Sequence, residues 1–133
     1  MKKLIILVGL PRSGKTTVAK KLAKKLDAPV VNPDSIRLAL HGQRFVKEAE
    51  PTVWYLADMM VKSHFQYGYD TVILDATNTT KDRRDRWISK DWVREFLVVD
   101  TWVDICLKRS KGDSEIIEAI RVMNAKYQPV SMN

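Results

Sequence analysis

The feature that most constrains the fold is an eight-residue segment with the pattern G-x-x-x-x-G-K-[ST], Gly9–Thr16. It follows the apolar run Leu4–Val8 and leads into Lys15–Leu26, where an apolar face lies opposite a row of lysines. Glycines let a backbone wrap closely around phosphate oxygens, and the N–H groups at a helix start point towards such an anion. A strand, a loop and a helix in this order are the context that the pattern requires. The segment therefore predicts a site for a nucleoside triphosphate.

Single residues of this segment have separate expected tasks. Lys15 is expected to reach the β- and γ-phosphates, and the Thr16 hydroxyl to hold Mg²⁺. The alternative is a glycine-containing turn that begins an ordinary helix, but a chance match in 133 residues is on the order of 1%. The residues that we expect to contact the nucleotide are Gly9, Pro11, Arg12, Ser13, Gly14, Lys15, Thr16 and Thr17.

The rest of the chain predicts an α/β fold. Leu4–Val8, Thr71–Leu74 and Phe96–Val99 are apolar almost throughout, and Pro29–Val31 is a weaker fourth run. Such runs are typical of strands that helices cover on both faces of a parallel sheet. The predicted helices that alternate with them are Lys15–Leu26, Pro33–Leu40, Thr52–Tyr67, Thr80–Trp92 and Ser114–Tyr127. This alternation indicates βαβ units, and no repeat or linker interrupts it, so we expect a single domain over residues 1–133.

Composition and charge indicate the compartment of the protein and the kind of partner that it binds. The chain has 23 Lys and Arg against 16 Asp and Glu, a formal net charge of +7, which favours an anionic partner. The longest apolar run is far too short to span a bilayer. The single cysteine, Cys106, cannot form an internal disulfide and is expected to be structural. We therefore expect a cytoplasmic protein with no membrane partner.

A second polar cluster follows the predicted strand Pro29–Val31. Asp34 and Arg37 are three residues apart, so both side chains can project from one face of a helical turn. In a parallel sheet, the segment after a strand's carboxyl end lines the ligand crevice. A carboxylate there can accept a proton from an attacking hydroxyl, and an arginine can hold a phosphate. The alternative is an exposed helix start in which the two residues form an ion pair.

A third cluster follows the predicted strand Thr71–Leu74. Asp75 would hold Mg²⁺ through water or orient an acceptor hydroxyl. A carboxylate that ends an apolar strand needs a partner, which favours a functional role. Asn78 is placed either to bind the substrate or to cap the predicted helix Thr80–Trp92, and the sequence leaves both roles open.

Basic residues form two further features. One predicted helix carries Lys81, Arg83, Arg84, Arg86 and Lys90. Aspartates separate them, so a solvated helix face is the default interpretation and a polyanion track is the alternative. The segment 107–113 is a candidate lid that closes a cation over the transferred phosphate, or simply a basic helix end. Arg109 is the preferred lid cation, with Lys111 close behind.

Most large aromatic and sulfur-containing side chains are expected in the core. The candidates with core-like helical periodicity are Trp54, Tyr55, Met59 and Met60. The other three tryptophans, Trp87, Trp92 and Trp102, are expected to anchor helices to the sheet. Stacking of these tryptophans on nucleobases is the alternative.

Together these motifs resemble the kinase domain of phage polynucleotide 5′-kinases. The matching segments are residues 1–6 with Gly9–Thr16, Asn32-x-Asp34-x-x-Arg37, Asp75-x-Thr77-Asn78, Arg83-Arg84 with Trp87, Leu107-Lys108-Arg109-Ser110 and Tyr127-Gln128-Pro129. They cover nearly the whole chain. The resemblance implies a P-loop NTPase-type three-layer sandwich with a four-stranded parallel sheet flanked by helices. It also implies transfer of the γ-phosphate of ATP, with Mg²⁺, to a 5′-hydroxyl of DNA or RNA.

The resemblance assigns roles to single residues. It implies Asp34 as general base, with Lys15 and Arg37 in the catalytic set. Arg109 completes the expected catalytic set as the lid cation preferred from the residues themselves, because the resemblance does not choose between Arg109 and Lys111. The implied substrate-binding set is Asp34, Arg37, Asp75, Asn78 and Arg83. The lid here looks shorter than the family's. The phage enzymes also carry a 3′-phosphatase domain that this sequence does not contain, so kinase activity alone is expected.

Three classes of function remain in competition. The first is a 5′-hydroxyl kinase acting on a single-stranded or end-frayed nucleic acid, which the positive charge favours. The second is a small-molecule or nucleoside kinase on the same scaffold, similar to zeta-toxin or antibiotic phosphotransferases. The third is a nucleotide-binding switch without catalysis, in which Asp34 would not be needed. Affinity for a polynucleotide should fall steeply with salt, whereas affinity for a neutral metabolite should not.

Overall fold

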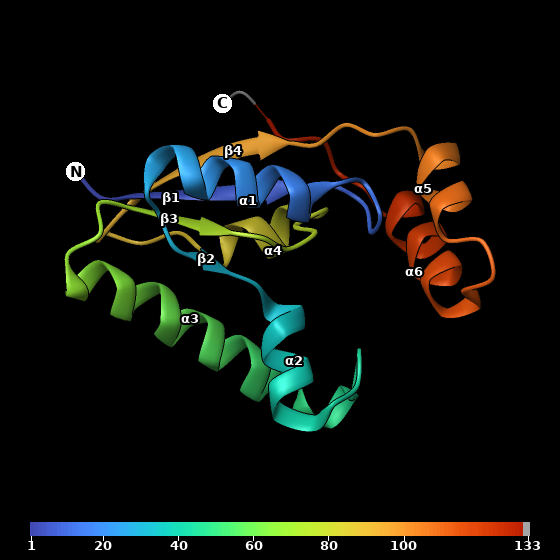
Figure 1. Cartoon of the computed structure of the whole chain (residues 1–133), viewed down its shortest axis with the longest axis horizontal. Coiled ribbons are helices and arrows are strands. Elements are labelled where there is room, and N and C mark those ends of the chain that lie inside the picture. The colour runs from blue at the N-terminus through green and yellow to red at the C-terminus, as the bar shows by residue number, and fades with distance from the viewer. Residues whose placement is uncertain (132–133) are drawn as a thin grey trace.

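Four parallel strands form the centre of the structure, a computed structural model that describes residues 1–131 (Figure 1). The strands are β1 (Lys3–Val8), β2 (Val30–Val31), β3 (Thr71–Leu74) and β4 (Val93–Val98), in the order β2-β3-β1-β4. Lys3 at the start of β1 pairs with Thr71 on one side and with Val93 on the other. The predicted four-stranded parallel sheet of an α/β fold is therefore confirmed, with β1 in its interior.

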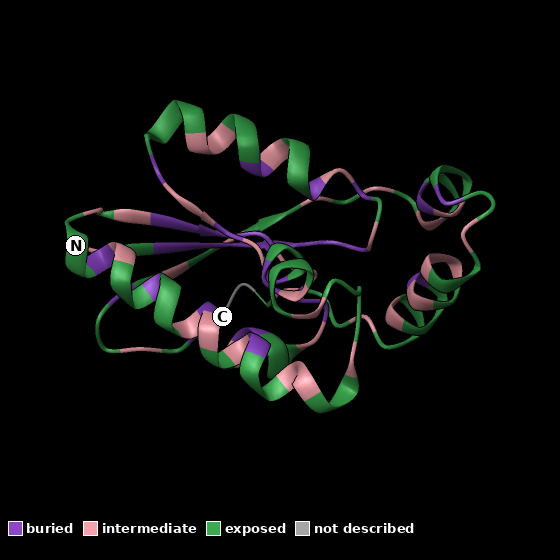
Figure 2. Cartoon of the chain, turned by 60° about the horizontal axis from the view of Figure 1, so that its bottom comes forward, coloured by how far each residue is buried: buried purple, intermediate pink, exposed green. Residues whose placement is uncertain are grey.

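Helices cover both faces of this sheet, which makes three layers. Helix α1 (Lys15–Leu26) packs on one face, where Ala19 lies against the cluster that contains Ile5 and Leu7. Helix α3 (Glu50–Tyr67) packs on the other face against alternate residues of β1, Leu4 and Ile6 among them. Figure 2 shows the buried strands between helices whose outer surfaces are exposed. The continuous apolar character of β1 follows directly, because both of its faces are covered.

The remaining elements surround the carboxyl ends of the strands. They are α2 (Pro33–His41), the short 3₁₀ helix η1 (Lys47–Ala49), α4 (Lys81–Asp85), α5 (Val103–Arg109) and α6 (Ser114–Ala125). Helices α5 and α6 lie beyond the strand ends (Figure 1) and share a small core with Cys106 and Leu10. Cys106 is fully buried, as the structural interpretation expects, and burial raises the pKa of its thiol. Within residues 1–131, no helix combines the length and apolarity of a bilayer span.

The predicted helix Thr80–Trp92 is wrong beyond its first turns. Helix α4 ends at Asp85, and β4 begins at Val93, three residues before the predicted strand. Trp87 and Trp92 are both buried, and the indole Nε1 of Trp92 donates to the carbonyl of Trp87 at 2.8 Å. Five residues of helix would place these two rings about 140° apart, so one helix cannot bury both. The chain turns between them instead.

The expected core positions on α3 also need correction. Tyr55, Met59 and Met60 are 61%, 44% and 39% exposed. The helix buries a single narrow stripe, at Val53, Ala57, Val61 and Phe65, with a spacing of four residues. Of the three tryptophans expected to anchor helices to the sheet, Trp87 and Trp92 are buried in the core but lie between α4 and β4 rather than in a helix, and Trp102 is 77% exposed.

Candidate active site

Two residues with a left-handed backbone conformation, and the close packing of other atoms around Gly9, shape the loop between β1 and α1. Arg12 has φ 66° and Gly14 has φ 99°. A Cβ on Gly9 would lie 2.8 Å from the Oγ of Ser13 and 2.9 Å from the carbonyl oxygen of Val99, so only glycine fits without a shift. The buried Ser13 hydroxyl has no hydrogen-bond partner among residues 1–131. The loop thus has the tight turns and spare donor capacity that a phosphate cradle needs.

Lys15 sits at the start of α1 with its ammonium group inside this loop. The side chain is almost buried, and its Nζ donates to the carbonyl oxygen of Leu10 at 2.8 Å. Burial lowers its pKa, and the nearby carboxylates of Asp75 and Asp34 oppose that shift. An ammonium group has three donors, so two remain for phosphate oxygens.

Thr16 and Asp75 form the second part of the site. The Thr16 hydroxyl donates to Oδ2 of Asp75 at 3.0 Å, and the Asn32 amide donates to the same oxygen at 3.3 Å. Asp75 is 4% exposed, and burial raises the pKa of its carboxyl group. Mg²⁺ prefers oxygen ligands and uses one or two from the protein, with phosphates and water completing the shell. The donor set of Thr16 and Asp75 therefore fits a nucleotide-bound Mg²⁺.

A cleft of about 1120 Å³ opens in front of these residues. It lies between the phosphate loop, the starts of α2, α3 and α4, and the inner side of α6. The predicted site residues that line it are Pro11, Arg12, Gly14, Lys15, Thr16, Thr17, Asp34, Arg37, Asp75, Arg83 and Arg109. The cleft thus brings together three polar clusters that lie far apart in the sequence.

The wall of the cleft at α2 is built on a charged triad. Asn32 caps α2 by accepting a hydrogen bond from the Asp34 N–H at 2.8 Å, and the Asp34 side chain is 79% exposed. Arg37 donates to Asp34 at 2.7 Å and, through Nε and Nη2, to both oxygens of Glu50 at 3.0 and 2.7 Å. Hydrogen bonds from Arg37 hold the pKa of Glu50 below its ordinary value. The ion pair of Asp34 and Arg37 that the sequence left as an alternative is therefore present, and it lies inside the cleft.

Glu50 and Trp54 are site residues that the sequence did not reveal. Glu50 is thirteen residues from Arg37 and lies outside any recognised motif. The Trp54 ring lies 5.7 Å from the guanidinium of Arg37, 5.2 Å from that of Arg83 and 5.6 Å from that of Arg86. Trp54 is half-buried: it packs against the core on one side and lines the cleft on the other. In the sequence, these positions are marked only by Pro51, which follows a polar segment and is typical of the first turn of a helix.

The opposite wall comes from the segment predicted as a lid. Nη1 of Arg109 donates to the backbone carbonyl of Arg12 at 3.0 Å, which holds this cation over the phosphate loop. Asp113, which caps α6, accepts a two-pronged contact from Arg44 at 3.0 and 2.8 Å. Arg109 lines the cleft and Lys111 does not, so the geometry favours Arg109 as the lid cation.

Asn78 has a structural position. Its side-chain amide donates to the backbone carbonyls of Leu7 at 2.9 Å and Ala76 at 3.3 Å, and it does not line the cleft. The cap of α4 is Thr80, whose hydroxyl accepts from the Arg83 N–H at 3.3 Å. Of the two roles left open for Asn78, the helix cap is therefore wrong, and substrate binding stays a prediction for a residue that lies outside the cleft. Its amide ties β1 to the loop after β3.

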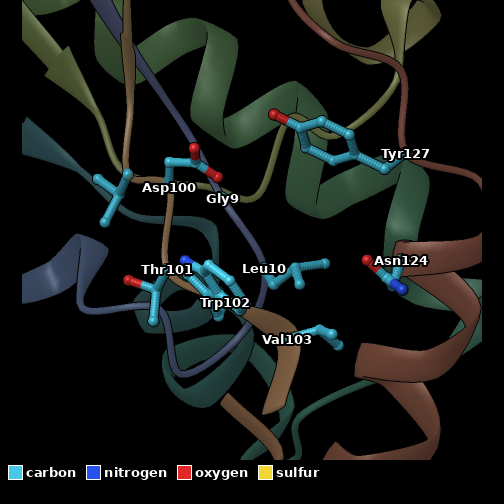
Figure 3. Close-up of a pocket in the computed structure, with 9 residues that line it drawn as sticks. Gly9, Leu10, Asp100, Thr101, Trp102, Val103, Asn124 and Tyr127 are labelled. Atoms are coloured by element: carbon cyan, nitrogen blue, oxygen red, sulfur yellow. The ribbon is translucent and has the colours of Figure 1, made fainter. Parts of the chain in front are cut away.

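A second, smaller cavity of about 430 Å³ lies behind the phosphate loop (Figure 3). Its walls include Gly9 and Leu10, the exposed ring of Trp102, and Asn124 and Tyr127 from the end of the chain. The residues expected to act in catalysis line the larger cleft instead. We therefore take the larger cleft as the candidate active site.

Comparison with known proteins identifies the class. The sequence profile of the AAA domain family (AAA_33) matches residues 4–112, so the chain belongs to this family. It is 30% identical to a chain in the Pnkp1/Rnl/Hen1 complex, with a TM-score of 0.69, covering 81% of this chain and 39% of that one. A second chain, from the Pnkp1/Rnl/Hen1 RNA repair complex, is 22% identical with a TM-score of 0.71, covering 96% of this chain and 46% of that one.

A shikimate kinase from Acinetobacter baumannii shares the fold as well. It is 20% identical with a TM-score of 0.61, and the match covers 94% of this chain and 75% of that one. The protein spans less than half the length of the two chains from the Pnkp1 complexes. The fold is of the P-loop NTPase type, with a four-stranded parallel sheet flanked by helices.

Proposed function

We propose that this protein transfers the γ-phosphate of ATP to the 5′-hydroxyl of a DNA or RNA strand, with Asp34 as the general base. One observation carries the proposal: the exposed carboxylate of Asp34 shares a cleft with Lys15, in a wall that also presents Arg37, Trp54 and Arg83. Cations beside an aromatic ring suit an acceptor that carries phosphates and bases. The 30% identity to a chain of the Pnkp1/Rnl/Hen1 complex, an RNA repair complex, supports a nucleic-acid acceptor.

The reaction follows from the tasks of the residues in the cleft. Asp34, oriented by its 2.7 Å hydrogen bond from Arg37, accepts the proton of the 5′-hydroxyl as the new bond to the γ-phosphorus forms. The bond from the γ-phosphorus to the bridging oxygen breaks, and ADP leaves. Lys15, the loop N–H groups and Arg109 stabilise the charge on the phosphoryl group in flight. Thr16 and Asp75 would hold Mg²⁺, which would supply positive charge to the phosphates.

A small-molecule or nucleoside kinase is the second candidate. The shared fold with a shikimate kinase supports it, and a cleft of about 1120 Å³ has room for a metabolite beside ATP. A neutral acceptor would offer no negative charge for Arg83 to bind in the cleft. Salt separates the two candidates, because each phosphate contact with a single strand adds about 0.7 to the slope of log affinity against log salt.

The test is transfer of labelled γ-phosphate from ATP and Mg²⁺ to a 5′-hydroxyl oligonucleotide and to a nucleoside, side by side. We expect label on the oligonucleotide and a fall in kcat of about 10²–10⁴ for Asp34→Asn. Asp104→Asn, at an exposed aspartate of α5, is the matched control and should keep full activity. Label on the nucleoside alone would favour the small-molecule kinase, and an unchanged rate for Asp34→Asn would refute its role as base.

A further inference from the structure

We propose that Arg83 and Arg86, held over the indole ring of Trp54, bind the backbone phosphates of an acceptor strand beyond its 5′-terminal nucleotide. The inference rests on the proposed function, because it extends the wall of the same cleft. It adds a subsite for the part of the strand that takes no part in the transfer. The ligand class is a single-stranded polynucleotide with at least two phosphates after the reacting hydroxyl.

The first argument is the charge that the structure leaves uncompensated. In the basic segment around α4, Arg84 is buried and donates to the carbonyl of Asn78, and Lys81 pairs with Asp85. Arg83 and Arg86 form no ion pair within residues 1–131. The aspartates of this segment form no ion pair with either guanidinium group, although the Glu50 carboxylate lies near enough to attract Arg83. Of the two interpretations of this basic segment, the structure favours the polyanion track.

The second argument is the arrangement around Trp54. The guanidinium groups of Arg83 and Arg86 lie 5.2 and 5.6 Å from the centre of the same ring. The two residues are three positions apart at the end of α4, so they emerge on one side of the helical turn. Two cations on one ring repel each other, and a bound anion would relieve that repulsion. The Trp54 side chain packs against the core cluster beneath α3, which holds the ring in place.

The third argument is the direction in which a bound strand would leave the cleft. Trp54 and Arg83 line the cleft together with Asp34, whereas Arg86 lies outside it. A path from Asp34 past Arg83 to Arg86 therefore leads out of the cleft. With the reacting hydroxyl at Asp34, the next phosphates of a strand would meet Arg83 first and Arg86 afterwards. An acceptor of one nucleotide would not extend to Arg86, so the subsite predicts a dependence on strand length.

The experiment compares Arg86→Gln with Arg121→Gln, which removes the same charge from an exposed arginine of α6. The acceptors are a nucleoside 3′-monophosphate and a short single-stranded 5′-hydroxyl oligonucleotide. For Arg86→Gln we expect KM for the oligonucleotide to rise about fivefold. The slope of log kcat/KM against log salt should fall by about 0.7. KM for the nucleoside 3′-monophosphate and kcat for both acceptors should match the wild type and Arg121→Gln.

The inference is overturned if KM for the oligonucleotide is unchanged by Arg86→Gln, or if it rises equally for both acceptors. Fluorescence anisotropy with the same labelled strand separates this failure from failure of the proposed function. A strand that binds through Arg86 but receives no phosphate would refute the proposed function and support the subsite. If the strand is phosphorylated with the same KM by the wild type and by Arg86→Gln, the proposed function is supported and the subsite is refuted.

Discussion

Replacing Glu50 with glutamine tests how strongly Glu50 and Arg37 hold together the wall of the cleft at α2. Glu50 accepts hydrogen bonds from Arg37 at 3.0 and 2.7 Å, and both side chains are only 15% exposed. Glutamine keeps the shape but removes the charge and offers one acceptor oxygen in place of two. A hydrogen bond to a charged group contributes about 1.5–3 kcal/mol, so we expect Glu50→Gln to lower the free energy of unfolding by about 2 kcal/mol.

The assay is urea unfolding at neutral and acid pH, with Glu48→Gln as the matched control. Glu48 is exposed, and no hydrogen bond or ion pair of its side chain is present within residues 1–131. Arg37 holds the pKa of Glu50 below its ordinary value of 4.5. The stabilisation by Glu50 is therefore complete above that pH and is lost as the pH falls through the lower, folded-state pKa. The difference between wild type and Glu50→Gln should be largest at pH 7 and shrink below pH 4.5.

Activity gives a second readout for the same variant. Arg37 pairs with both Asp34 and Glu50, so in Glu50→Gln the guanidinium that orients Asp34 loses one of its two carboxylate anchors. A base whose orienting partner is less firmly held meets the acceptor hydroxyl in the productive geometry less often, and we expect kcat to fall about tenfold. The reasoning is refuted if Glu50→Gln unfolds like Glu48→Gln, or if the stability difference is the same at pH 7 and pH 4.

Two further predictions concern the phosphate loop and the Mg²⁺ ligands. Gly9→Ala should lower the free energy of unfolding by about 1–3 kcal/mol and raise KM for ATP, because the added Cβ would lie 2.8 Å from the Ser13 Oγ; an unchanged melting temperature would show that the loop has room. Asp75→Asn should raise the Mg²⁺ concentration for half-maximal transfer about 10–100-fold. Burial raises the pKa of Asp75, so its charged form is unfavourable in the fold, and the melting temperature should stay equal or rise. A lower melting temperature for Asp75→Asn would contradict this account.

The phosphate loop and the sheet could be predicted from the sequence because their causes are local. The loop shape depends on consecutive residues, with Gly14 in a left-handed conformation directly before Lys15. The strands are marked by runs such as Leu4–Val8, which are apolar because helices cover both faces. The order of these runs along the chain was enough to predict a parallel sheet with helices between its strands.

The segment after β3 was predicted less well because its structure depends on packing. Polar residues from Thr80 onwards suit a helix, yet Trp87 and Trp92 both need the core, and no single helix can bury both. In the same way, Trp54 has the spacing of a core residue, but the stripe that α3 buries runs through Val53 instead. A rotation of about 100° on the helix places Trp54 at the cleft.

The sequence alone therefore predicted the phosphate loop, because the loop's shape and the positions of Lys15 and Thr16 depend on consecutive residues. The wall that faces it was decided only by the tertiary structure. Glu50 meets Arg37 across thirteen positions, and Trp54 meets Arg83 and Arg86 from a different helix. Contacts of this kind have no periodicity and no fixed spacing, since they arise where separate helices begin beside the carboxyl ends of the strands. Only the packing of α2, α3 and α4 brings those charges and that ring together.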